Sequence, residues 1–201
     1  MERTKILAKA LAQNEIKEDP EKNNILTNDP SMTAWGWAVV TAQGKVLDSG
    51  CIKTASGGKK RRIRKGDETV HRVGEINQKL LEVIKKYHIS YMLSELPHGS
   101  QNASAAVMIG VVVGIAQTLS DALGIGIEFY SEGDSKKCAL GKRAAEKIEM
   151  VNCMKTHYEG WYKGTKYIDE AVADALAVHY VASKESSILK LYKTNNENGK
   201  I

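Results

Sequence analysis

Three acidic residues occur where a carboxylate is costly, beside or inside apolar segments. Asp29 follows the predicted strand 25–27, Glu95 follows the predicted strand 91–93, and Asp174 lies within the apolar run 171–177. A buried carboxylate without a partner is strongly unfavourable, so each of these acids needs a cation, a metal ion or access to solvent. Carboxylate oxygens suit a hard divalent cation such as Mg²⁺ or Mn²⁺. The three acids therefore predict a metal site built from carboxylates.

Two neighbouring residues compete for the place of a fourth acid in this site. Glu170 lies four residues before Asp174, about 40° around a helix, so both side chains can face one site. Asp169 points further round and is of a residue type that often caps a helix N-terminus. Both remain candidate metal ligands, with Glu170 preferred.

Apolar periodicity predicts the elements that must bring these acids together. Two strands are expected within residues 25–40 and single strands at 46–52, 89–94 and 125–130; helices are expected over 70–87, 104–123, 144–158 and 169–182. The first strands form a hairpin or meander, and the later alternation of strands and helices favours parallel pairing. The sequence thus predicts an α/β fold with a mixed five-stranded sheet flanked by helices. Residues 1–24 are predicted to be an N-terminal extension, 25–190 the folded domain and 191–201 a polar tail.

Length and composition indicate a globular protein with one ordinary core. The chain has 201 residues, of which 42% are hydrophobic, and its 29 basic and 24 acidic residues give a net charge of +5, which permits a polyanionic partner. The three cysteines lack CxxC spacing, which predicts no zinc site and favours a reducing compartment. Residues 104–123 are nearly long enough for a membrane span but carry Gln117, Ser120 and Asp121. We expect a cytoplasmic protein without a membrane partner.

Basic residues gather in two segments that could contact a phosphate backbone. A solvated loop is as good an interpretation of the first segment as DNA contact, although such charge would make binding salt-dependent. This segment comprises Lys59, Lys60, Arg61, Arg62, Arg64 and Lys65. The second group is predicted to flank the acids and to contact phosphates, and it comprises Lys137, Lys142 and Arg143.

The order of these motifs resembles that of the RuvC-type Holliday junction resolvases. The run ILTNDPS at 25–31 and GWAVV at 36–40 are similar to the opening of that family. Glu95 with a helix starting near 102–104, then YS at 130–131 with SKK at 135–137, and finally ADALA at 173–177 follow in the family's order. The resemblance covers residues 25–182 and implies an RNase H-like fold, with catalytic carboxylates from the first strand, a central strand and the last helix.

The resemblance also implies roles for individual residues. Asp29, Glu95 and Asp174 match the family's catalytic acids, whereas the fourth family acid falls on Ala171. That departure is why Glu170 and Asp169 are rival candidates.

Three further positions match residues with a role in the family. Lys136 and Lys147 fall on lysines that assist catalysis or hold the scissile backbone. His98 takes the place of an aromatic residue that stacks at the opened junction.

The function implied is a structure-selective endonuclease that resolves four-way DNA junctions by paired symmetric nicks. Two Mg²⁺ or Mn²⁺ ions per site would activate water and stabilise the leaving 3′ oxygen. Paired nicks imply a two-fold homodimer, to which the helix at 104–123 or its neighbours could contribute the contact. The alternatives are an RNase H-like nuclease acting on RNA or on branched or flap DNA, and a catalytically inactive nucleic-acid-binding module. The presence of the acids argues against the inactive module.

Overall fold

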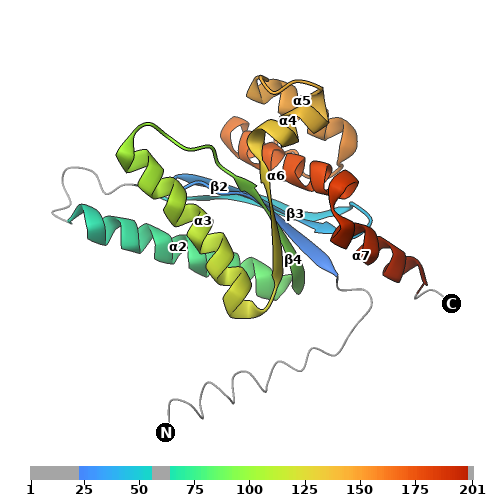
Figure 1. Ribbon diagram of the computed structural model, residues 1–201, viewed down its shortest axis with the longest axis horizontal. Helices are drawn as coiled ribbons and strands as arrows, with labels where there is room; N and C mark the ends of the chain where they lie inside the picture. The colour runs from blue at the N-terminus through green and yellow to red at the C-terminus, as the bar shows by residue number, and fades with distance from the viewer. Residues whose placement is uncertain (1–22, 56–63, 199–201) are drawn as a thin grey trace, which may run out of the picture.

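The computed structural model describes residues 23–55 and 64–198, which form a mixed five-stranded sheet between two layers of helices (Figure 1). The strands are β1 (Asn24–Asp29), β2 (Ala34–Thr41), β3 (Val46–Lys53), β4 (Ile89–Leu96) and β5 (Gly126–Ser131). Their order in the sheet is β3-β2-β1-β4-β5. β1 pairs antiparallel with β2 and parallel with β4, and β4 pairs parallel with β5. The predicted mixed sheet is confirmed.

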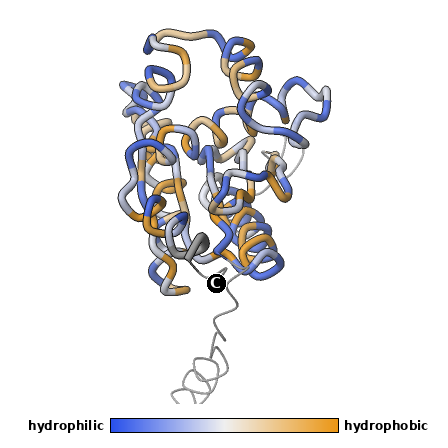
Figure 2. The backbone as a smooth tube through the Cα atoms, turned by 90° about the vertical axis from the view of Figure 1, so that its right-hand side faces the viewer, coloured by the Kyte–Doolittle hydropathy of each residue, from blue (hydrophilic) through white to orange (hydrophobic). Residues whose placement is uncertain are grey.

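The helices divide between the two faces of this sheet. α2 (Lys65–Lys86) and α3 (Ala103–Leu123) cover one face, and α4 (Glu132–Leu140), α5 (Lys147–His157) and α6 (Lys166–Glu185) cover the other (Figure 1). α7 (Ser187–Asn198) follows α6 and buries Leu189 against the edge of the second layer. Along the helices, hydrophobic and hydrophilic residues alternate, as expected for helices with one face on a sheet (Figure 2).

The alternation of side chains along the central strands decides which residues face which layer. In β1, Leu26 packs in the core under α2 and α3, whereas Ile25 packs with residues of α6. In β4, Met92 belongs to the first core and Leu93 to the second. Consequently every second residue of both strands faces α6, up to the ends of the strands.

α6 lies directly on the centre of the sheet because Gly36 in β2 leaves room for its backbone. A Cβ atom at Gly36 would lie 2.1 Å from the carbonyl oxygen of Ala171. Gly36 pairs with Asp29, the last residue of β1, so this close approach brings the start of α6 next to that acid.

Several expectations from the sequence need correction or lie outside the described residues. α4 was not predicted, because its nine residues are mostly polar, and helical structure continues to Asn198 where a polar tail was predicted from residue 191. Lys59, Lys60, Arg61 and Arg62, and residues 1–22 of the predicted N-terminal extension, lie outside the described residues. The proposed division into domains stays a prediction.

α3 is long and apolar enough, by length and composition alone, to cross a membrane. Part of this apolar surface has another explanation, since Val112, Ile115, Ala116 and Leu119 pack in the core between α2, α3 and the sheet. Only 28% of its most apolar window is buried, so α3 keeps an exposed apolar face.

Candidate active site

β1 and β4 bring Asp29 and Glu95 to the same face and the same end of the sheet. The strands are parallel neighbours, and the two acids lie at their carboxyl ends. Asp29 continues the alternation of Ile25 and Thr27 toward α6, and Glu95 continues that of Tyr91 and Leu93. Two acids that are far apart in sequence therefore face the same helix.

α6 runs antiparallel to β1 and supplies the third acid. Near the start of β1, Val178 packs with Ile25; one turn earlier in α6, the carbonyl of Ala175 accepts a hydrogen bond of 2.5 Å from the Thr27 hydroxyl. The neighbouring Asp174 then lies above the end of β1. The side chain of Asp174 is 17% exposed. A carboxylate can therefore occur within this apolar helix because it lies over the open edge of the sheet.

The electrostatics of these acids show that they form one cluster. Burial, followed by the charge of Asp174, raises the pKa of Asp29 to about 7. Burial, followed by the charges of Asp29 and Asp174, raises the pKa of Glu95 to about 9. Burial also raises the pKa of Asp174, against the lowering effect of Lys147. The positive groups nearby thus do not offset the burial and mutual repulsion of these acids, which bind protons more tightly than usual.

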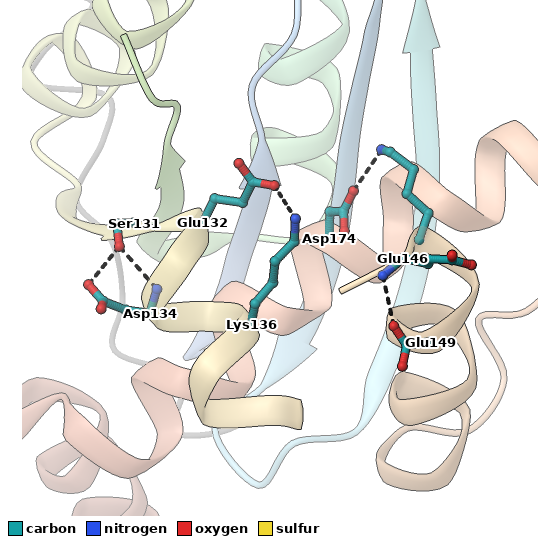
Figure 3. Close-up of polar contacts among 8 residues, drawn as sticks. Ser131, Glu132, Asp134, Lys136, Glu146, Glu149 and Asp174 are labelled. Carbon is teal, nitrogen blue, oxygen red and sulfur yellow. Dashed lines mark hydrogen bonds and ion pairs between the residues drawn. The ribbon is translucent and has the colours of Figure 1, made fainter. Parts of the chain in front are cut away.

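Two lysines reach the acids from the helices that lie beside α6, and Figure 3 shows one of them, Lys136, in α4. Lys147, the first residue of α5, donates a hydrogen bond of 3.0 Å to Asp174 Oδ2. Lys136 in α4 donates to Glu132, and its charge lowers the pKa of both Glu95 and Asp174. Both lysines selected from the sequence therefore lie at the acids.

Glu132 is a further acid at this edge that was missed from the sequence. It is the first residue of α4, directly after β5, and its charge raises the pKa of Asp29, Glu95 and Asp174. The sequence did contain a signal for this helix start, a serine at 131 followed three residues later by the acid Asp134. In the structure, the Ser131 hydroxyl caps the helix by accepting a hydrogen bond from the Asp134 backbone N–H.

The two rivals for the fourth acid have different surroundings. Asp169 is 2% exposed, and its Oδ1 accepts a hydrogen bond of 3.0 Å from the Lys163 backbone N–H, which ties the preceding loop to α6. Glu170 is half-buried and lies near Lys147, whose pKa its charge raises. Both acids border a pocket of about 530 Å³ that also includes Lys147.

The donor set fits a hard divalent cation, although its side chains do not enclose one as they stand. Glu95 is 8% exposed, and no described residue donates a hydrogen bond to its carboxylate. Within residues 23–55 and 64–198, no three Asp, Glu, His or Cys side chains converge in a ready-made metal site. Lys147 pairs with Asp174, and Lys136 pairs with Glu132. An oxygen-rich, under-compensated cluster of this kind is what Mg²⁺ and Mn²⁺ prefer.

The remaining basic candidates lie on the surface around this edge. His98 is exposed on the loop after β4, and its charge adds to that of Lys136, whose hydrogen bond is the main cause of the lowered pKa of Glu132. Lys137 is exposed, Lys142 pairs with Glu149 at 2.5 Å, and Arg143 pairs with Asp134 at 3.5 Å. On the other helical layer, Arg64 is exposed and pairs with Asp67 at 2.8 Å just before Lys65 begins α2.

The sheet order, the parallel β1 and β4, and the acids gathered under α6 define an RNase H-like fold of the nuclease type. Solved structures of similar fold include Thermus thermophilus RuvC in complex with Holliday junction substrate (TM-score 0.63, 19% identity, 80% of this chain and 95% of that chain). Another is the yeast mitochondrial Holliday junction resolvase (TM-score 0.59, 12% identity, 89% of this chain and 85% of that chain).

Sequence comparison narrows this class to one family. Residues 25–181 match the family model described as crossover junction endodeoxyribonuclease RuvC. Curated relatives of that name include those of Rickettsia massiliae (31% identity over 78% of this chain and 94% of the relative) and Shewanella amazonensis (30%, 78% and 86%). The chain belongs to the RuvC family, whose nucleases are metal-dependent, and the resemblance stated from the motifs is confirmed.

Proposed function

We propose that this protein resolves four-way DNA junctions by paired, symmetric, metal-dependent nicks. The observation that supports this most directly is the cluster of Asp29, Glu95 and Asp174 at one sheet edge, in a chain of the RuvC family. Relatives of the chain are crossover junction endodeoxyribonucleases, and a protein of similar fold has been solved with a Holliday junction.

Asp29, Glu95 and Asp174 would hold two Mg²⁺ or Mn²⁺ ions, which supply an activated water and stabilise the leaving 3′ oxygen when bound. The chain prepares this site in two ways. Burial keeps water away from the carboxylates and makes them strong ligands once a cation replaces their protons. The backbone contacts between α6 and the sheet fix the distance of Asp174 from β1. Of the two acids proposed from the sequence, Glu170 is freer to join them, because Asp169 already holds the Lys163 backbone.

Lys147 and Lys136 would bring positive charge to the scissile phosphate. In the absence of DNA they neutralise the acids, Lys147 through Asp174 and Lys136 through Glu132. Lys137, Lys142 and Arg143 extend the basic surface beyond the site, and His98 offers a ring to an unstacked base. We propose that Arg64, Lys65 and the basic segment Lys59, Lys60, Arg61 and Arg62 contact the backbone of a junction arm.

Paired nicks require two sites related by symmetry, and α3 provides a surface for a second copy of the chain. Val107 is 59% exposed, and Ala106, Gly110 and Gly114 are exposed beside it. Exposed apolar patches of this kind on a soluble domain usually mark an interface. We therefore propose a homodimer formed through α3.

The function is tested with a synthetic mobile four-way junction labelled on each strand. Wild-type protein with Mg²⁺ is expected to nick two opposing strands symmetrically, and Asp174→Asn to bind the junction without cutting it, because the amide keeps the shape and loses the charge. Cutting of RNA or flap DNA in preference to the junction would replace this function with that of another RNase H-like nuclease. Binding without any cutting by the wild type would indicate an inactive module.

The dimer is tested by light scattering after gel filtration. Wild type is expected at twice the chain mass and Val107→Glu at one chain mass, because a carboxylate would be buried in the interface. Leu191→Glu is the matched control, since Leu191 is 62% exposed on α7, away from α3. A dimer that survives Val107→Glu would remove α3 from the interface.

A further inference from the structure

The family's fourth acid has no counterpart at its usual place in this chain, and the structure shows why none fits there. Ala171 is 6% exposed, and its carbonyl lies against Gly36 of β2. A carboxylate on this residue would have to be accommodated where helix and sheet already touch. Position 171 therefore cannot supply the fourth acid, which leaves Glu170 in the same helix and the acids of other elements.

Glu132 enters the same edge from the opposite side of the cluster. In the pairing of β4 with β5, Tyr130 lies opposite Glu95 and Ser131 opposite Leu96, and Glu132 is the next residue. It therefore begins α4 immediately beyond the strand end that carries Glu95. Figure 3 shows its side chain directed to the Lys136 ammonium group, on the side of α4 toward Asp174.

Two observations indicate that a cation belongs between these acids. Glu95 as a residue is 8% exposed, and no described residue donates a hydrogen bond to its carboxylate, which keeps some access to the sheet edge. The Lys136 side chain, 21% exposed, places its ammonium on Glu132, and its charge reaches Glu95 and Asp174 as well. The protein's own ammonium group thus provides positive charge to Glu132 directly and, at longer range, to Glu95 and Asp174.

We propose that Glu132 is the fourth cation-binding carboxylate of this site, and that Lys136 is its substitute cation until a metal ion binds. The inference rests on the proposed metal-dependent function and assigns a ligand that the family pattern does not supply. When Lys136 turns to the DNA backbone, Glu132 is released for the metal. Replacement of one charge partner by another keeps the buried edge compensated in both states.

The test measures metal binding without DNA or turnover. Full-length wild type and Glu132→Gln are titrated with MnCl₂ by calorimetry, after circular dichroism has shown that both are folded. Glu132→Gln is expected to bind Mn²⁺ at least about tenfold more weakly. Asp134→Asn is the matched control, because Asp134 lies in the same helical turn but bonds Ser131 and Arg143, and it is expected to keep wild-type affinity. Wild-type affinity in Glu132→Gln would overturn the assignment.

A second variant separates a ligand from a residue that only positions Lys136. If Glu132 binds the metal, Lys136→Met removes the competing ammonium and Mn²⁺ binding becomes tighter than in the wild type. If Glu132 acts only through Lys136, Glu132→Gln has no further effect on Mn²⁺ affinity once Lys136 is already Met, and that result would also overturn the proposal. Asp174→Asn separates this proposal from the proposed function. If Asp174→Asn loses Mn²⁺ binding and Glu132→Gln keeps wild-type affinity, the proposed metal-dependent function stands and Glu132 is not a ligand.

Discussion

Replacing Gly36 by alanine tests whether the close contact between β2 and α6 sets the geometry of the site. The new Cβ atom would lie 2.1 Å from the Ala171 carbonyl oxygen and 2.5 Å from its carbon, whereas ordinary contacts begin at 3.4 Å. Both obstructing atoms are backbone, so no side chain can rotate away. The start of α6 must retreat from the sheet by on the order of 1 Å, and Asp174 retreats with it.

The expected cost falls on both activity and stability. Displacement of a catalytic group by about 1 Å can lower the rate by about 100-fold. Overpacking of this kind costs about 1–3 kcal/mol, which in a chain of this size lowers the Tm by several degrees. Initial rates of junction nicking with Mg²⁺ and a thermal melt followed by circular dichroism measure the two effects.

The same substitution elsewhere provides the control. Gly74 is exposed within α2, and a Cβ atom there would meet nothing within 4 Å. Gly74→Ala is expected to raise stability by about 0.5–1 kcal/mol through helix propensity and to leave nicking unchanged. Gly36→Ala protein that cuts at the wild-type rate and melts at the wild-type temperature would refute the argument that this contact positions Asp174.

Three other predictions concern the acids and their partners. The raised pKa values of Asp29 (about 7) and Glu95 (about 9) mean that the folded chain binds protons more tightly than the unfolded chain, so stability in EDTA should fall as pH rises from 5 to 9. Urea unfolding midpoints measured from pH 5 to pH 9 test this prediction. Mg²⁺ should remove the dependence of the midpoint on pH, and a midpoint that rises with pH in EDTA would contradict the prediction. Lys147→Met should raise the pKa of the acids further and move the acid limb of the nicking rate to higher pH, which a pH–rate profile measures; an unmoved limb contradicts it. Asp169→Asn should destabilise the fold by about 1–3 kcal/mol by weakening the acceptor for Lys163, whereas Glu170→Gln should leave the melt unchanged. Equal melts of these two variants would contradict the structural role of Asp169.

The central acids were predictable because their local context is simple. Asp29 and Glu95 end short apolar runs, and strand alternation together with parallel pairing places such residues at one sheet edge. Asp174 was predictable as a charged residue in an apolar helix. The alternation of residues along a strand likewise places Trp35 and Trp37 on one face of β2, where Trp35 is fully buried and Trp37 packs against the same core.

Glu132 and the surroundings of Asp169 depend on contacts that local patterns do not contain. α4 has little apolar periodicity, so nothing in its own residues indicates that it packs beside α6 and the end of β5. Asp169 was considered as a helix cap, yet it accepts a hydrogen bond from the loop at Lys163. Likewise α7 is stabilised by Leu189, which packs with Ile25 and Leu93, a long-range contact.

The distribution of the acids along the chain has a consequence for the protein during its synthesis. Asp29 emerges from the ribosome early, but its neighbours in the site come from β4, α4 and finally α6, near the end of the chain. A nascent or prematurely terminated polypeptide therefore lacks the assembled carboxylate edge. Under the proposed function, a polypeptide that ends before α6 lacks Asp174 and should not cut DNA.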